Sequence, residues 1–195
     1  MKQLSVIYIP GIGDTNPATQ RKAVKTWAWW GVEAELFQMN WQDDTKWAVK
    51  FQRLLDRIDE ISSKGQPVAL VGASAGASAC INAYAARKKE IVGIVSISGK
   101  INNPQDIGPR YRTNNPSFVE SAYACEQSLN KLNESDRSHI LSRYAIFDAI
   151  VLRRDSKVLG AHNRTVPSLG HLITIALQIT IGAPSFIRFL KKQIK

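Results

Sequence analysis

The chain has 195 residues, of which 44% are hydrophobic and 22% charged. This composition excludes global disorder, and the length is enough for one sizeable hydrophobic core. We therefore expect a single domain over residues 1–195. The formal net charge is +10, but no zinc-finger spacing or RNA-binding aromatic motif accompanies it, so the sequence carries no specific nucleic-acid motif. We expect a solvated basic face, with an anion-binding surface as the alternative.

Cysteine content and hydropathy bound the setting of the protein. Cys80 and Cys125 are the two cysteines, and a chain of this size does not need the one disulfide they could form, which favours a reduced cytoplasmic setting. The apolar run at 4–9 leads into Pro-Gly and not into the small-residue cleavage site of a signal peptide, so we interpret it as a buried first strand. The apolar run at 172–183 is shorter than the roughly 20 residues that cross a bilayer, so we expect no transmembrane segment.

Short apolar runs alternate with longer helical patterns in the first half of the chain. Asn16-Pro17 suits the start of a helix, because asparagine can cap and proline fits the first turn. Gly31 is a suitable place for that helix to end. A further helix is indicated between residues 47 and 61, where apolar residues recur at helical spacing. The expected order is a strand at 4–9, a helix from 16 to 31, a strand from 32 to near 41 and a helix from about 47 to 61.

The second half continues this alternation around one different segment. Residues 100–137 begin loop-like, with several prolines, and become helical in pattern from about 117 to 132, so we treat 100–137 as a possible small cap or lid within the domain. The other expected elements are strands at 68–71, 91–97, 139–147 and 163–169, a small-residue helix to about 89, and C-terminal helices.

Strands that alternate with helices predict parallel strands joined by right-handed crossovers. The apolar runs lack polar alternation, which is typical of strands buried on both faces. We therefore predict an α/β fold: a three-layer α/β/α sandwich around a mostly parallel six-stranded sheet. Sites in such sheets form at the carboxyl ends of the strands, and four segments follow those ends: Gly11-Ile12-Gly13, Ser74, Asp148 and Gly170-His171.

The pattern Gly72-x-Ser74-x-Gly76 lies between a predicted strand and a predicted helix. A serine on so sharp a turn is held in a strained conformation with its hydroxyl clear of the sheet, and glycines allow strand and helix to approach closely. The alternative is a small-residue junction made only for packing. A dinucleotide-binding loop is disfavoured, because Asn16 stands where the third glycine of that motif is expected.

The segment around Ser74 resembles the nucleophile elbow of the α/β-hydrolase superfamily, and the resemblance extends over most of the chain as a minimal six-strand core. The family's first two antiparallel strands are missing. The family orders its triad as serine, acid and histidine, and His171 follows the last predicted strand as the family's histidine does. His139 and His162 lie at the amino ends of strands, the wrong edge of the sheet; a capping or core histidine is the alternative role for His171.

Three aspartates compete for the role of the acid that the resemblance implies. Asp148 follows a strand, and the run from Asp148 to Val151 is similar to the family's Asp-x-x-Val stretch, so Asp148 is our prediction. Asp155 is the first alternative, although its arginine neighbours suggest a surface ion pair. Asp106 is a more distant candidate.

The resemblance also implies an oxyanion hole made of backbone N–H groups. Ala75, which follows the serine, supplies one donor, and Ile12 supplies the other, with Gly13 as its alternative. The family often has His-Gly where this chain has Pro10-Gly11, and this segment can also be a simple tight turn. In the lid-like segment, four residues either line an acyl pocket or, as we expect, only cover the sheet: Tyr111, Phe118, Tyr123 and Leu129.

The function implied by the resemblance is a serine hydrolase that cleaves a small-molecule carboxylic ester or thioester through an acyl-enzyme, with esterase or lipase activity. Such chemistry requires no metal and no organic cofactor. Two other classes stay open: a hydrolase-fold protein that binds without turnover, and a protein that binds nucleic acid or another anionic surface through its basic face. The sequence indicates neither the acyl length of the substrate nor the oligomeric state.

Overall fold

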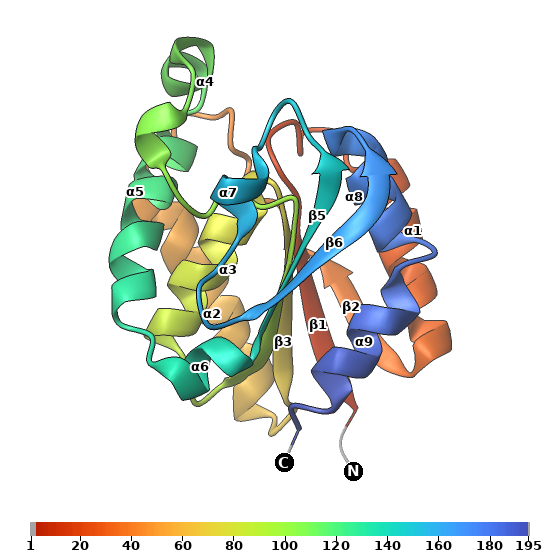
Figure 1. Cartoon of the computed structure of the whole chain (residues 1–195). Coiled ribbons are helices and arrows are strands. Elements are labelled where there is room, and N and C mark those ends of the chain that lie inside the picture. The colour runs from red at the N-terminus through yellow and green to blue at the C-terminus, as the bar shows by residue number, and fades with distance from the viewer. Residues whose placement is uncertain (1–2, 195) are drawn as a thin grey trace.

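Six parallel strands form one sheet in the order β2-β1-β3-β4-β5-β6, with helices on both faces (Figure 1). This computed structural model describes residues 3–194. The predicted α/β/α sandwich is therefore confirmed, and the sheet is parallel throughout. The chain starts at β1, one strand in from the edge, adds the edge strand β2, and then crosses back past β1 to add β3, β4, β5 and β6 in turn.

Alternation along the central strands divides the core into two layers. In β1, Val6 and Tyr8 pack into the layer beneath one sheet face, whereas Ile7 and Ile9 pack into the layer beneath the other. All of these side chains are fully or almost fully buried, because successive residues of a strand point to opposite faces and helices cover both. This explains why the strand reads as one continuous apolar run.

The helices divide between these two layers. One layer contains apolar side chains of α2, α3 and α5, and the other contains those of α1, α8 and α9 together with Trp27. Alanine, glycine and serine dominate the first turns of α3, and their small size lets this helix lie directly against the sheet. The site described below lies where α3 begins.

The largest differences from the predicted boundaries occur in three places. The helix expected from 16 to 31 is an α-helix only to Lys25 and then a 3-10 turn, which ends at Gly31 with φ of 69°. The second strand ends at Leu36 and does not reach Trp41, which is fully buried in a loop where its ring packs against Trp47 and Phe118. The helix expected to continue to about residue 89 ends at 86.

The elements follow in chain order. They are β1 Leu4–Ile9, α1 Ala18–Lys25, η1 Thr26–Trp30, β2 Val32–Leu36, α2 Trp47–Ser63, β3 Val68–Ala73, α3 Ala75–Ala86, β4 Ile91–Ile97, η2 Pro104–Asp106, α4 Pro109–Asn114, α5 Pro116–Asn130, α6 Glu134–Ser138, β5 Ile140–Phe147, α7 Arg153–Ser156, β6 His162–Leu169, α8 His171–Ile179 and α9 Ala183–Lys191.

Candidate active site

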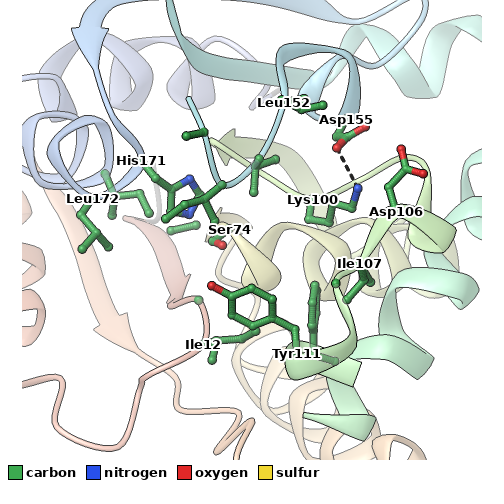
Figure 2. A pocket seen from close by; sticks show the side chains of 18 of the residues that line it. Ile12, Ser74, Lys100, Asp106, Ile107, Tyr111, Leu152, Asp155, His171 and Leu172 are labelled. Atoms are coloured by element: carbon green, nitrogen blue, oxygen red, sulfur yellow. Dashed lines mark hydrogen bonds and ion pairs between the residues drawn. The ribbon is translucent and has the colours of Figure 1, made fainter. Parts of the chain in front are cut away.

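A cavity of about 520 Å³ opens at the carboxyl ends of the central strands. Its walls come from the loops after β1, β3, β4 and β5 and from the first turn of α8. Ser74 and His171 both line this cavity, and Figure 2 shows the imidazole ring beside the serine. Among the residues that the structure describes, no direct hydrogen bond joins the two side chains. Such contacts are often long before substrate binds.

Ser74 occupies a sharp turn between β3 and α3. Its backbone has φ of 52° and ψ of −118°, a conformation that residues other than glycine rarely adopt. Three backbone hydrogen bonds hold it: the Ser74 N–H donates to the Ile97 carbonyl, and the Ser74 carbonyl accepts from the N–H groups of Ala77 and Lys100. The surrounding backbone therefore imposes a strained conformation on Ser74, and such strain is characteristic of functional positions.

The two glycines that flank Ser74 make room for this turn. A Cβ on Gly72 would lie 2.5 Å from the carbonyl oxygen of Gly76, and a Cβ on Gly76 would lie 2.1 Å from the carbonyl oxygen of Ile9. Both distances are far below any real Cβ contact, and the atoms opposite belong to the backbone. The helix can therefore start this close to β1 and β3 only where side chains are absent.

His171 is the first residue of α8 and contacts Asp148. Gly170 precedes it with φ of 95°, which turns the chain from β6 into the helix. The Nδ1 atom of His171 lies 2.8 Å from Oδ2 of Asp148, and both side chains are buried. A carboxylate on Nδ1 fixes the tautomer and orientation of the ring, so that Nε2 is the free nitrogen.

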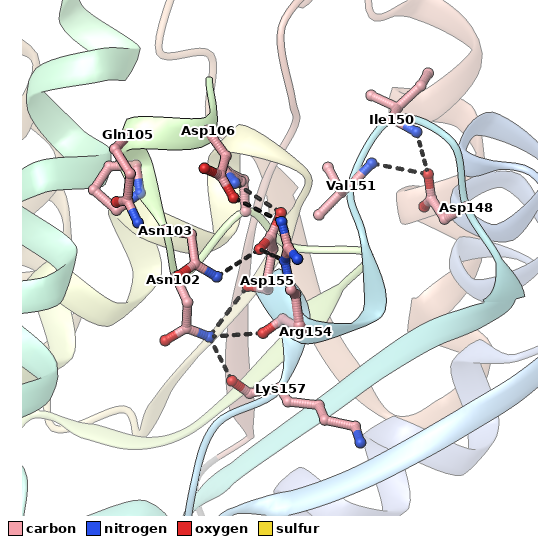
Figure 3. Close-up of polar contacts among 12 residues, drawn as sticks. Asn102, Asn103, Gln105, Asp106, Asp148, Ile150, Val151, Arg154, Asp155 and Lys157 are labelled. Carbon is pink, nitrogen blue, oxygen red and sulfur yellow. Dashed lines mark hydrogen bonds and ion pairs between the residues drawn. The ribbon is translucent and has the colours of Figure 1, made fainter. Parts of the chain in front are cut away.

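Asp148 is held by its own loop as well as by the histidine. Its Oδ1 accepts hydrogen bonds from the N–H groups of Ile150, at 2.9 Å, and Val151, at 3.0 Å (Figure 3). Burial alone would raise the pKa of Asp148. The hydrogen bonds from His171 and from these two backbone amides outweigh burial and hold the pKa of that carboxyl below its usual value.

The other two candidate acids do not contact His171. Asp155 was expected in a surface ion pair with its arginine neighbours. It does pair with Arg154, at 3.7 Å, but the surface placement was wrong because Asp155 is buried. Its Oδ2 pairs with the Lys100 ammonium at 2.7 Å (Figure 2), and its Oδ1 accepts from the Asn103 amide at 2.7 Å (Figure 3). Asp106 forms a more exposed pair with Arg154 at 2.9 Å. Asp155 thus joins the loop after β4 to α7.

The turn after β1 lies directly against the serine. A Cβ on Gly11 would lie 2.7 Å from the Cβ of Ser74 and 3.3 Å from its Oγ, and Ile12 lines the cavity. Gly13 has φ of 93°. Ala75 is the first residue of α3, whose amino-terminal amides and positive dipole end lie next to the serine. The backbone groups expected to bind an oxyanion are thus brought to the same place as Ser74.

Asp14 is a residue of this region that sequence reasoning missed. It is fully buried, and its carboxylate accepts hydrogen bonds from the N–H groups of Asn40, at 2.7 Å, and Trp41, at 3.3 Å. Burial raises the pKa of Asp14 against the effect of these bonds. The Trp41 indole also donates to the Pro10 carbonyl at 3.1 Å. In the sequence, the only indication that Asp14 anchors this turn is its position directly after Gly11-Ile12-Gly13.

Four residues of the segment 100–137 divide between the two expected roles. Tyr111 and Phe118 line the cavity. Tyr123 is exposed on α5, and Leu129 is buried in the core layer against α3. The expectation that all four only cover the sheet was therefore wrong for Tyr111 and Phe118.

The remaining predicted features were found as follows. His139 immediately precedes β5, and His162 begins β6 and packs on the Phe189 ring, so both lie at the amino edge of the sheet. Cys80 and Cys125 are buried with free thiols. Within residues 3–194, no three His, Cys, Asp or Glu side chains are grouped to hold a metal ion. Over the same residues no single helix passes the length and hydropathy test for a membrane span; α8 and α9 pass it only as a pair bent by 62°.

Comparison with known proteins relates this architecture to esterases and lipases. No family model and no curated protein sequence matches the chain. Solved structures do match it. Est1E from Butyrivibrio proteoclasticus has a TM-score of 0.72 and 16% identity over 99% of this chain and 89% of its own. The monoacylglycerol lipase of Paleococcus ferrophilus has a TM-score of 0.65 and 12% identity over 97% and 94%.

A third match names the fold. Alpha/beta hydrolase domain-containing protein 10 from mouse has a TM-score of 0.65 and 14% identity over 98% of this chain and 90% of its own. At such identities a likeness establishes the fold and nothing further. The chain therefore has the α/β-hydrolase fold, as the resemblance around Ser74 predicted.

Proposed function

We propose that this protein is a serine hydrolase that cleaves a carboxylic ester or thioester, with Ser74 as nucleophile, His171 as general base and Asp148 as the acid that orients the histidine. The observation that carries the proposal is the 2.8 Å contact between His171 Nδ1 and Asp148, made at a cavity that Ser74 also lines. Asp155 and Asp106 have other partners, which favours Asp148 as the acid.

The reaction begins when His171 removes the proton from the Ser74 hydroxyl, whose oxygen attacks the ester carbonyl. Asp148 stays ionised and stabilises the imidazolium that forms. The proton then passes to the leaving alcohol or thiol, and an acyl group remains on Ser74. A water molecule, activated by the same histidine, attacks this acyl-enzyme, which releases the acid and restores the serine.

The tetrahedral intermediate carries a negative charge on the former carbonyl oxygen. The backbone N–H groups of Ile12 and Ala75 are the proposed donors to it, with Gly13 as the alternative to Ile12. Each such donor contributes about 3 kcal/mol to stabilisation of the transition state. Asp14, through Asn40 and Trp41, holds the turn that carries Ile12 and is a positioning residue.

The cavity supports a substrate of small to moderate size with an apolar portion. Its volume of about 520 Å³ lies within the range of ordinary ligand sites. Ile107, Tyr111 and Phe118 are among its lining residues, and such apolar side chains suit an acyl or alkyl group better than a sugar or a peptide.

Labelling with a fluorophosphonate tests the proposal, since this reagent reacts with serines that a neighbouring base activates. We expect the wild type to be labelled and Ser74→Ala to remain unlabelled. Ser78→Ala is the matched control, because it removes a buried hydroxyl one turn further along the same helix and should be labelled like the wild type. A folded wild type that resists labelling would favour a binding protein without turnover.

A further inference from the structure

Large apolar side chains are exposed around the mouth of the cavity. Leu172, 73% exposed, and Ile150, 55% exposed, both line the cavity from its outer edge. Figure 2 shows Leu172 next to His171 and Leu152 beyond it, on the side of Asp155. We call this set the apolar rim: Phe147, Ile150, Leu152, Leu169, Leu172 and Ile173.

Neighbouring segments of the fold present this rim together. Leu169 and Phe147 are partners in the register of β5 and β6, and Ile173 follows on the first turn of α8. Leu169 is 65% exposed and Ile173 58%. Proteins rarely leave several large apolar side chains grouped in water, and such groups mark surfaces that meet a partner or a lipid.

Two exposed arginines adjoin, in sequence, a rim residue and a residue of the cavity lining. Arg110 is exposed next to Tyr111, and Arg153 is exposed next to Leu152. Among the described residues neither arginine pairs with a carboxylate, whereas the carboxylates that line the cavity, Asp106 and Asp155, are already paired with cations. No carboxylate in the described part of the chain neutralises either guanidinium, although that of Arg153 also lies over the Tyr144 ring, 5.8 Å from its centroid, and the chain has a net charge of +10.

We propose that the apolar rim docks this protein onto an anionic lipid surface. Apolar side chains enter the boundary of the acyl chains, while flanking arginines are attracted to anionic headgroups. Given the ester hydrolysis proposed above, on which this step rests, docking brings the mouth of the cavity onto the membrane, so that lipid esters reach Ser74 without crossing water. A nucleic acid would not use the apolar side chains, and a purely apolar partner would not use the arginines.

A second exposed apolar group provides an internal control. Trp29 is 82% exposed and Trp30 47%, and the Lys191 ammonium donates to the Trp30 carbonyl. This pair lies just before β2 begins, hence at the amino edge of the sheet, whereas the apolar rim lies at the carboxyl edge. A membrane cannot contact both ends of the sheet at once, so the two sites are separable by mutation.

Sedimentation with vesicles measures docking without any need for turnover. Ser74→Ala and the wild type should both sediment with vesicles of phosphatidylglycerol and phosphatidylcholine in equal parts, and not with phosphatidylcholine alone. Leu169→Ser combined with Ile173→Ser should lower the partition coefficient at least about 10-fold. Arg110→Gln and Arg153→Gln should each lower it about fivefold, and high salt should also weaken it. Trp29→Ser should sediment as the wild type does.

Hydrolysis of a soluble ester separates docking from catalysis. Leu169→Ser/Ile173→Ser should hydrolyse p-nitrophenyl acetate within about twofold of the wild-type rate, because both positions are surface sites outside the cavity. Failure of the wild type to sediment would overturn the docking proposal, as would a loss caused by Trp29→Ser but not by the rim variant. A homodimer that the rim variant dissociates would also overturn it, since the rim would then be covered by a second copy. Sedimentation by a protein with no esterase activity would sustain the docking surface and refute the proposed function alone.

Discussion

Replacing Gly76 with alanine should damage both stability and activity, although it adds a single methyl group. The new Cβ would lie 2.1 Å from the Ile9 carbonyl oxygen and 2.7 Å from the Pro10 carbonyl oxygen. Neither atom can move independently, because Ile9 is the last residue of a central strand and Pro10 precedes the turn that lies against Ser74. The start of α3 must therefore move away from β1.

The size of the effect follows from this backbone contact. Overpacking of a well-packed core costs about 1–3 kcal/mol, and a clash between backbone atoms belongs at the upper end, so we expect a loss of about 3 kcal/mol in the free energy of unfolding. For a chain of this length that lowers the melting temperature by roughly 6–12 °C. Displacement of Ala75 from Ile12 should also reduce kcat/KM, by about 100-fold if alignment with one oxyanion donor is lost.

Urea denaturation and hydrolysis of a p-nitrophenyl ester measure the two effects. Gly108→Ala is the matched control: a Cβ there meets only Tyr111, at 4.0 Å, and the φ of −62° suits alanine. This variant should be as stable as the wild type or more stable, by about 0.4–1 kcal/mol. If Gly76→Ala unfolds at the wild-type urea concentration and keeps full activity, the close approach of α3 to β1 does not constrain the site.

The remaining predictions concern three aspartates. Asp148→Asn should lower kcat about 10⁴-fold with the fold retained. Asp155→Asn should instead lower the free energy of unfolding by about 3 kcal/mol, because Lys100 would stay buried without its counter-charge. Equal losses of activity for the two variants in ester assays would contradict the assignment of Asp148 as the acid. Because the folded-state pKa of Asp148 lies below the usual 3.8, its stabilisation is present above the unfolded-state pKa and is lost as the pH falls through the folded-state pKa. Urea titrations below about pH 4 should therefore show a steeper loss of stability for the wild type than for Asp148→Asn. Asp14→Ala should reduce kcat more than it raises KM, since the freed turn would misplace the Ile12 amide; unchanged steady-state kinetics would refute its positioning role.

The central part of the site was predictable because it depends on local chemistry. Gly72, Ser74 and Gly76 form a pattern whose backbone requirements are met within five residues. The resemblance supplied His171 and favoured Asp148, and the structure places these two side chains in contact. Asp155 was misjudged as a surface residue because its neighbours in sequence are arginines. It does pair with Arg154, but its shorter contact is with buried Lys100, 55 residues away.

The sequence by itself determined the alternation of strands and helices, since hydrophobic periodicity and small-residue turns are local properties that survive without a partner. The tertiary structure alone decided which buried carboxylate meets the imidazole, which residues of 100–137 reach the cavity, and how Asp14 anchors the turn after β1. The physical reason is that these contacts join segments far apart in the chain. Their distances depend on the order of strands in the sheet and on the paths of the connecting loops, which no local pattern encodes.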